Sequence, residues 1–172
     1  MAGASHLVLV GLPGAGKTTV GRALAARLGR PFVDLDARIT ARAGLSVAEI
    51  FASQGEARFR ELERQATEEI AAAEAPMVVA PGGGWVVVPG LVALLRPPSR
   101  LVWLRLSPQS ALARMGASVL DRPLLAGDDP LAALTGILAT REAAYLQSDH
   151  TVSVETMTPD EVVDAIVTLA RP

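Results

Sequence analysis

The most constraining feature of the sequence is a glycine-rich segment near its start, residues 11–18, which reads GLPGAGKT. It fits the phosphate-binding loop pattern of glycine, four residues, glycine, lysine, and serine or threonine. The glycines let backbone amides turn inward around phosphate groups, and the following helix points its positive N-terminus at the anion. The chain's own residue frequencies give roughly one chance in a thousand of meeting this pattern by accident.

The residues around this segment match what such a loop requires. Residues 6–10 form a short β-branched apolar run, typical of a strand buried on both faces, and a helical pattern follows from Lys17 to about Leu28, ending at Gly29. Lys17 is the only lysine among sixteen basic residues, and its slim ammonium suits a phosphate better than arginine does. The alternative is an ordinary turn between strand and helix with an exposed lysine.

Short apolar runs and helical patterns alternate along the rest of the chain. We expect further strands near residues 31–35, 77–80, 101–106 and 151–154. We expect helices over residues 46–74, 107–115, 130–146 and 159–170, the first opened by a capping box and divided at Gly55. Such alternation predicts an α/β fold with three layers, in which helices cover both faces of a five-stranded parallel sheet.

The organisation expected is one domain over residues 1–172, because this length and an apolar fraction of 50% suit a single hydrophobic core. The stretch 116–130 lacks a clear pattern and is longer than a bare connection needs. We interpret residues 116–129 as a mobile lid.

Composition excludes several classes of protein. The absence of cysteine excludes disulfides and thiolate zinc sites, and His6 and His150 form no metal-binding pattern. A net charge of −2 without a basic block argues against nucleic acid. No apolar stretch is long enough to span a membrane, and the N-terminus does not resemble a secretory signal. We therefore expect a cytoplasmic protein without nucleic-acid or membrane partners, and a monomer.

Two aspartates follow the second expected strand. Asp34 and Asp36 alternate by two, so they point to opposite faces of the strand unless the chain turns there. Beside a phosphate loop, one carboxylate could hold the water shell of Mg²⁺ while the other orients a hydroxyl nucleophile. The alternative for the aspartate nearer the helix is a structural N-cap.

Three arginines lie within two turns of the expected helix over residues 46–74. Arg58, Arg60 and Arg64 could bind an anion. They could equally form a solvated face paired with Glu61 and Glu63.

Two further features come from segments after the third strand and before residue 130. Gly82, Gly83 and Gly84 directly follow a strand, and their entropic cost is repaid if backbone approaches a ligand closely, although a plain turn is the alternative. Arg122 lies in the expected lid, where it could act on a phosphate or be a surface arginine. Because ligands bind beyond the carboxyl ends of parallel strands, the glycine loop, the aspartates and the glycine triplet are expected to meet at one cleft.

Together these motifs resemble the shikimate kinase family. The segments that carry the resemblance cover essentially the whole chain, in the family's order and approximate spacing: GLPGAGKTTVGRALA, FVDLD, FRELE, VVAPGGGWV, DRPLL and TREAAY. The resemblance implies a P-loop NTPase fold of the nucleoside monophosphate kinase type. It also implies ATP-dependent phosphorylation of the 3-hydroxyl of shikimate, giving shikimate 3-phosphate and ADP, in chorismate and aromatic amino-acid biosynthesis.

The resemblance also implies roles for individual residues. It places the ATP phosphates on Gly14, Ala15, Gly16, Lys17, Thr18 and Thr19. It assigns Mg²⁺ to Thr18 and, through water, to Asp34, and it places Arg114 by the adenine.

For the acceptor, the resemblance implies that Asp36 binds the hydroxyls and stands ready to accept a proton, while Arg60 and Arg141 hold the carboxylate. Gly83, within the triplet 82–84, would offer its backbone to the ring. Arg122 would close over the transferring phosphate, so that Lys17, Asp36 and Arg122 are the expected catalytic residues.

The chain departs from the family pattern at a few positions. Thr67 stands where a large aliphatic residue is usual, and Trp85 follows the triplet where a small residue is commoner. Met157 lies where relatives often carry an arginine by the adenine, and the lid has one extra residue before Arg122. Two other functions remain open at this stage: a kinase of the same fold acting on a polyol acid such as gluconate, and a nucleotide-binding relative without turnover. Asp36 and Arg122 argue against a pure binder, which would not need them.

Overall fold

The computed structural model describes residues 5–170, and the outermost residues of the expected domain, 1–4 and 171–172, lie outside that range. Five parallel strands form one sheet in the order β2-β3-β1-β4-β5. Their bounds are Leu7–Val10 for β1, Phe32–Asp34 for β2, Val78–Ala80 for β3, Arg100–Arg105 for β4 and His150–Ser153 for β5. The five-stranded parallel sheet predicted from the sequence is confirmed.

Strand β1 lies at the centre of the sheet between β3 and β4, in register with Val78 at Leu7 and with Trp103 at Val10. All four of its residues are buried, and they divide by alternation between two hydrophobic cores. Leu7 and Leu9 face one core, whereas Val8 and Val10 face the other. A strand whose side chains are buried on both faces therefore explains the uninterrupted apolar run.

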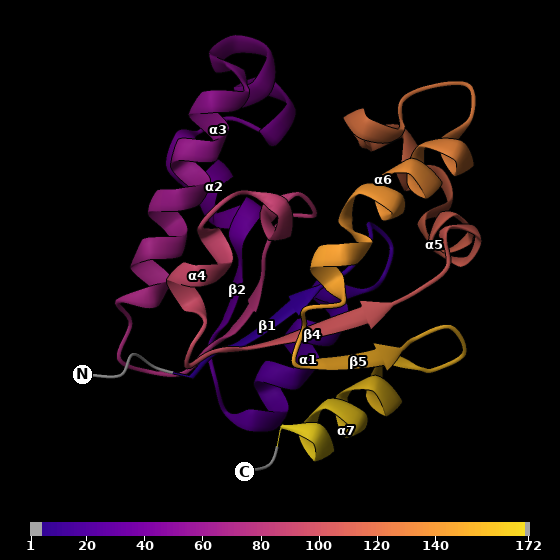
Figure 1. Cartoon of the computed structure of the whole chain (residues 1–172). Coiled ribbons are helices and arrows are strands. Elements are labelled where there is room, and N and C mark those ends of the chain that lie inside the picture. The colour runs from indigo at the N-terminus through magenta and orange to yellow at the C-terminus, as the bar shows by residue number, and fades with distance from the viewer. Residues whose placement is uncertain (1–4, 171–172) are drawn as a thin grey trace.

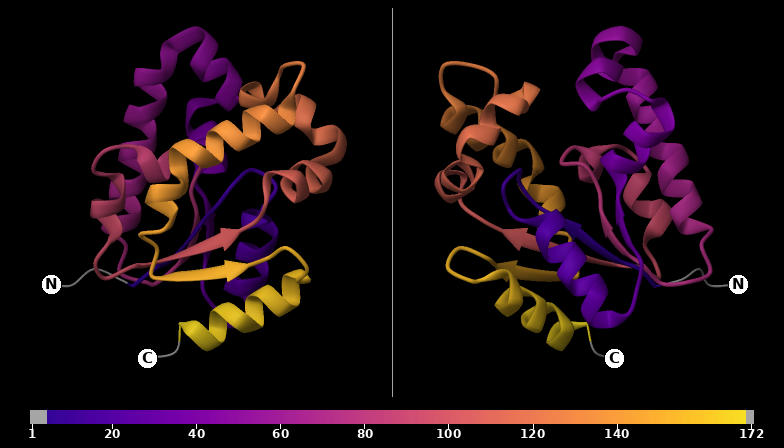
Figure 2. Two further views of the ribbon diagram at one scale, coloured as in Figure 1. Left: turned by 45° about the vertical axis from the view of Figure 1, so that its right-hand side comes forward. Right: turned by 180° about the vertical axis from the view of Figure 1, so that it is seen from behind.

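Helices cover both faces of the sheet (Figure 1). Their bounds are Lys17–Leu28 for α1, Leu35–Ala43 for α2, Val47–Ala71 for α3, Leu91–Leu95 for α4, Pro108–Met115 for α5, Pro130–Tyr145 for α6 and Pro159–Leu169 for α7. α1 and α7 lie side by side on one face, while α2, α3 and α4 pack on the other (Figure 2). α6 crosses above the sheet and contributes to both cores, through Leu134 and Tyr145.

Several boundaries follow local rules that the sequence displayed. α1 ends at Gly29, whose left-handed backbone closes the helix, and α3 begins with the capping box of Ser46 and Glu49. At Gly55 the backbone leaves helical geometry, with φ 83° and ψ 166°, so α3 consists of two helices as expected. None of the helices within residues 5–170 is long and apolar enough to cross a membrane.

The sequence reasoning missed three elements. Leu35 was expected to end the second strand, but it opens α2, and α4 and the short 3-10 helix η1 (Trp85–Val87) were not predicted. The stretch 116–130 is also more ordered than expected, because it contains two 3-10 helices, η2 (Gly116–Asp121) and η3 (Pro123–Leu125). These elements are three to nine residues long, and a period of 3.6 is difficult to recognise over so few residues.

Candidate active site

A cleft of about 710 Å³ opens at the carboxyl ends of the strands. The phosphate loop, the two aspartates and the start of the glycine triplet line it, as the sequence predicted. Its lining includes the following expected site residues: Gly14, Ala15, Gly16, Lys17, Thr18, Thr19, Asp34, Asp36, Gly82, Gly83, Arg114 and Arg122. Arg60, Gly84 and Arg141 do not line this cleft but lie directly behind its glycine edge.

The phosphate loop is held in shape by its own backbone. Gly14 and Gly16 have positive φ angles of 82° and 90°, which glycine adopts readily. A methyl group at Gly14 would lie 2.7 Å from the Ala111 carbonyl oxygen of α5, so no side chain fits there. The Lys17 ammonium donates hydrogen bonds to the carbonyls of Gly11 and Leu12 at 2.8 and 2.9 Å. The positive φ angles and the two lysine hydrogen bonds therefore hold the loop in shape, with Lys17 against its carbonyls.

Lys17 carries a perturbed pKa. Loss of hydration on burial, and next the positive charges of Arg122 and Arg141, lower its pKa from 10.5 to about 8, against the opposing effect of Asp36 and Asp34. The causes of this pKa shift show that the charges of several expected site residues act on Lys17. An anion placed at the loop would relieve it by favouring the ammonium form.

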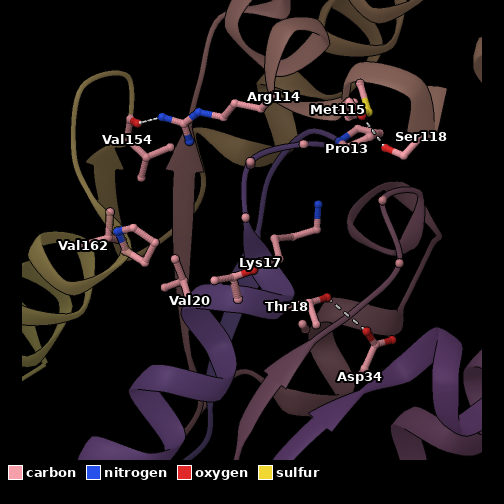
Figure 3. A pocket seen from close by; sticks show the side chains of 18 of the residues that line it. Pro13, Lys17, Thr18, Val20, Asp34, Arg114, Met115, Ser118, Val154 and Val162 are labelled. Atoms are coloured by element: carbon pink, nitrogen blue, oxygen red, sulfur yellow. Dashed lines mark hydrogen bonds between the residues drawn. The ribbon is translucent and has the colours of Figure 1, made fainter.

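Asp34 makes two hydrogen bonds, one as the N-cap of a helix and one to a residue of the phosphate loop. Its Oδ1 accepts a hydrogen bond from the Ala37 amide at 3.0 Å, which makes it the N-cap of α2, and its Oδ2 accepts one from the Thr18 hydroxyl at 3.2 Å (Figure 3). The N-cap thus fixes the Asp34 carboxylate beside Thr18.

The oxygen donors at this point suit a hydrated Mg²⁺. No group of three or more histidine, cysteine, aspartate or glutamate side chains within the described chain could hold a metal. Mg²⁺ needs no such group, because it keeps several waters and is bound by one or two protein oxygens together with substrate phosphates. Thr18 and Asp34 provide that donor set next to the loop.

Asp36 lies in the first turn of α2, because the chain turns between the two aspartates. Its Oδ1 is buried and has no hydrogen-bond partner among the described residues. A methyl group at Gly82 would lie 2.6 Å from this oxygen, so the triplet's backbone packs directly against it. Burial, and next the negative charge of Asp34, raise the pKa of Asp36, while Lys17, Arg60 and Arg122 oppose the rise. A carboxylate with a raised pKa is a better proton acceptor.

Arg60 is held by a buried carboxylate. Its Nη1 donates to Glu63 Oε2 at 2.8 Å, and Glu63 is 0% exposed. Burial raises the pKa of Glu63, although its hydrogen bond and ion pair with Arg60 act in the opposite direction. A methyl group at Gly84 would lie 3.0 Å from Arg60 Nη2. Its neighbours are surface residues: Arg58 pairs with Glu61, and Arg64 donates to the Pro89 carbonyl.

Arg141 is the most deeply placed arginine of the site, with only 7% of its surface exposed. It comes from α6, one turn before Tyr145, whose ring stacks on Trp103 with centroids 5.4 Å apart. Its Nη1 is buried without a hydrogen-bond partner in residues 5–170, and a methyl group at Gly83 would lie 2.7 Å from that nitrogen. A buried cation with an unused donor is costly unless an anion completes it.

The glycine triplet therefore has a structural explanation at each position. Gly82 faces Asp36, Gly83 faces Arg141 and Gly84 faces Arg60. Any side chain at these positions would occupy the space beside one carboxylate and two guanidinium groups that come from three different helices. We name this group, Asp36, Arg60, Arg141 and the triplet 82–84, the acceptor pocket, after the role that the sequence resemblance implies for it.

Arg122 is exposed at the junction of η2 and η3, on the lining of the cleft. No hydrogen bond or ion pair engages its guanidinium within the described residues, yet its charge acts on both Lys17 and Asp36. Segment 116–129 is anchored in the core at two points, because Val119 and Leu125 are buried in the cluster shared with α1 and α7.

The far end of the cleft is largely apolar. Arg114 donates hydrogen bonds to the carbonyls of Val154 and Glu155, so its guanidinium is anchored to the loop after β5 (Figure 3). Met157 lines the cleft there, in place of a charged contact. Sequence reasoning missed the remaining lining residues at this end: Met115, Ser118, Val154, Pro159 and Val162. These residues lie close in sequence to Arg114 and Met157, and that closeness could have identified them as lining residues.

Comparison with known proteins agrees with this geometry. A sequence model of the family described as shikimate kinase matches residues 13–171. A shikimate kinase of Synechococcus sp. (strain CC9605) is 44% identical over 163 residues, covering 95% of this chain and 81% of the relative.

Solved structures give the same result. A shikimate kinase from Acinetobacter baumannii, solved in complex with shikimate, superposes with a TM-score of 0.90 at 31% identity, covering 98% of this chain and 93% of the other. A gluconokinase from Sinorhizobium meliloti reaches a TM-score of 0.57 at 22% identity, with coverage of 97% and 92%, which shows a shared fold alone. By its sequence along almost the whole chain and by its fold, this protein belongs to the shikimate kinase family.

Proposed function

We propose that the protein transfers the γ-phosphoryl group of ATP to the 3-hydroxyl of shikimate, giving shikimate 3-phosphate and ADP in chorismate and aromatic amino-acid biosynthesis. The observation that carries this proposal is the acceptor pocket, which sets an unpartnered carboxylate oxygen and a buried, unpartnered guanidinium nitrogen beside a phosphate loop. A small acid with several hydroxyls supplies a partner for each of these groups.

The donor side would work by position and charge. The amides of the phosphate loop and the N-terminus of α1 bind the phosphates, and Lys17 turns from the loop carbonyls to the β and γ phosphates. Thr18 and Asp34 would hold Mg²⁺, which when bound supplies further positive charge to the phosphates. The apolar end of the cleft, from Arg114 to Val162, suits the adenine.

On the acceptor side, Arg60 and Arg141 would hold the carboxylate of shikimate and so fix the direction of the ring. Asp36 then hydrogen-bonds the attacking hydroxyl and accepts its proton. Because phosphoryl transfer is loose and needs little deprotonation early, orientation of the hydroxyl by Asp36 contributes alongside its deprotonation. The hydroxyl attacks in line, without a covalent enzyme intermediate.

Segment 116–129 would act as a lid that brings Arg122 onto the transferring phosphoryl group. Arg122 is exposed and has no hydrogen bond or ion pair within residues 5–170, which supports this role because it gains a charged partner only on closure. Val119 and Leu125, which are buried, are the anchors on which such a lid would turn. Hydrogen exchange in the free and liganded protein tests the lid: equal protection in both states would show a static connection.

The experiment that tests the function is an ADP-release assay with shikimate, quinate and gluconate as acceptors. We expect shikimate to support turnover far above the other two. Preference for gluconate would make the protein a polyol-acid kinase of the same fold, and nucleotide binding without turnover on any acceptor would make it a binding protein.

A further inference from the structure

Two buried residues near the acceptor pocket are joined by a hydrogen bond that the catalytic roles above do not use. The indole Nε1 of Trp85 donates to the Thr67 hydroxyl at 3.0 Å, and Trp85 is 1% exposed. The same hydroxyl donates to the Glu63 carbonyl at 2.7 Å. The Thr67 hydroxyl therefore donates its single proton to the backbone of α3 and accepts the indole N–H through a lone pair.

The pair completes a closed ring of contacts. Arg60, Glu63 and Thr67 are spaced by three and four residues, so they share one face of α3. Arg60 bonds the Glu63 side chain, Thr67 bonds the Glu63 backbone, and Trp85 bonds Thr67. Trp85 follows Gly84 directly in the chain, and Gly84 packs against Arg60. The chain of contacts therefore begins and ends at Arg60.

The glycine triplet needs a fixed end for a physical reason. Three consecutive glycines have more backbone freedom than any other tripeptide, so their place relative to the arginines depends on what holds their two ends. Strand β3 ends at Ala80 and holds one end in the sheet. At the other end, Trp85 is buried in the core between the sheet and α3. Apolar packing alone is non-directional, whereas the indole hydrogen bond defines one position along α3.

We propose that Trp85, acting through Thr67, is a positioning residue that sets the glycine triplet against Arg60 and Arg141 for binding of the acceptor's carboxylate. This inference rests on the proposed function. Loss of the hydrogen bond lets the triplet shift along α3, which alters the spacing of Gly83 and Gly84 to the two guanidinium groups. The phosphate loop follows a different strand, β1, and takes no part in this chain of hydrogen bonds, so we expect the acceptor alone to be bound more weakly.

The test is a double-mutant cycle of Trp85→Phe and Thr67→Val, with KM for shikimate, KM for ATP and thermal stability measured for each protein. Trp85→Phe keeps an aromatic ring in the core but removes the donor, and we expect KM for shikimate to rise roughly threefold to tenfold, the scale of one buried hydrogen bond. Thr67→Val leaves the buried indole N–H of Trp85 without an acceptor. It should therefore lower thermal stability and raise KM for shikimate. The double variant has no unsatisfied group, so it regains stability, yet its KM for shikimate stays raised.

Two control variants separate positioning from packing. Thr67→Ser keeps the hydroxyl and is expected to keep the KM for shikimate of the wild type. Val86→Ala removes apolar core directly beside Trp85 without touching the hydrogen bond, and is expected to lower stability with both KM values unchanged.

The contrary outcomes are distinct. If the double variant regains both stability and KM, or if Val86→Ala raises KM for shikimate as much as Trp85→Phe does, the pair is only structural and the inference is overturned. If the wild type fails to phosphorylate shikimate while turning over another acceptor, the proposed function falls and the inference falls with it.

Discussion

The phosphate loop and the acceptor pocket are built in opposite ways. The loop is one contiguous segment whose backbone and lysine satisfy one another, as in the hydrogen bonds from Lys17 to the carbonyls of Gly11 and Leu12. The pocket combines residues from α2, α3, α6 and the segment after β3, and buried polar atoms of Asp36, Glu63 and Arg141 stay without partners within residues 5–170.

This difference indicates which of the two regions selects the acceptor. A loop that binds phosphate through backbone amides and one lysine offers the same cradle to any polyphosphate, so it confers little choice of acceptor. Unpartnered buried groups are costly until a ligand of matching chemistry satisfies them, so the pocket discriminates among acceptors. Changes in the loop should therefore abolish turnover, while changes at the arginines and glycines of the pocket should shift acceptor binding alone.

The largest effect is expected from Lys17→Ala. Its ammonium would neutralise charge on the transferring group, so turnover should fall on the order of a thousandfold. The fold should persist, because the lowered pKa shows that burial already disfavours the charged side chain. Steady-state kinetics and a thermal melt check both points, and wild-type turnover in this variant would remove Lys17 from the mechanism.

Gly83→Ala tests the pocket with a single methyl group. That methyl would lie 2.7 Å from Arg141 Nη1, and displacing a binding group by about 1 Å can cost on the order of a hundredfold. We expect KM for shikimate to rise on that scale while KM for ATP stays near the wild-type value. Gly136→Ala is the matched control on α6, where a methyl group meets no atom within 4 Å and both KM values should be retained. Equal effects from the two variants would contradict the role of the triplet.

Removing the two arginines separates binding from stability. Either alanine variant should weaken shikimate binding by roughly 1.5 to 3 kcal/mol, the scale of a charged hydrogen bond, without loss of ATP affinity. Arg60→Ala should also destabilise the protein, since it leaves the buried Glu63 without its ion pair.

The pH dependence of that destabilisation has a definite sign. The pKa of Glu63 is already raised in the folded protein and rises further without Arg60, so the unfolded chain releases its proton first and stability falls as pH increases through the folded pKa. Arg141→Ala should show no more of this trend than the wild type does. Melts across pH for the two variants provide the measurement, and parallel curves would contradict the buried pair.

The smallest effect concerns the protonation of Lys17. Its pKa near 8 means that ATP affinity of the free protein should fall above pH 8, at most about tenfold per pH unit, because only the ammonium binds phosphate well. Shikimate affinity should change far less over the same range. Calorimetry in buffers of different ionisation enthalpy should reveal proton uptake on ATP binding above pH 8. Lys17→Arg should show no such uptake, since arginine stays charged.

The sequence by itself determined the features that depend on neighbouring residues. The strand before the loop, the loop with Lys17, the helix ending at Gly29 and the division at Gly55 all follow from local backbone preferences. The resemblance to a family named the pocket residues in advance, and the alternation of strands and helices placed the cleft.

Only the tertiary structure decided how distant residues meet. Each glycine of the triplet faces a different side chain, and Thr67 and Trp85 form one hydrogen bond, which are contacts between separate segments. The burial of Glu63 likewise depends on what packs over its face of α3. Sequence spacing carries no information on such contacts, because they depend on how α3 and α6 pack on the sheet. The physical reason is that backbone preference acts over a few residues, whereas burial and electrostatic pairing are properties of the assembled core.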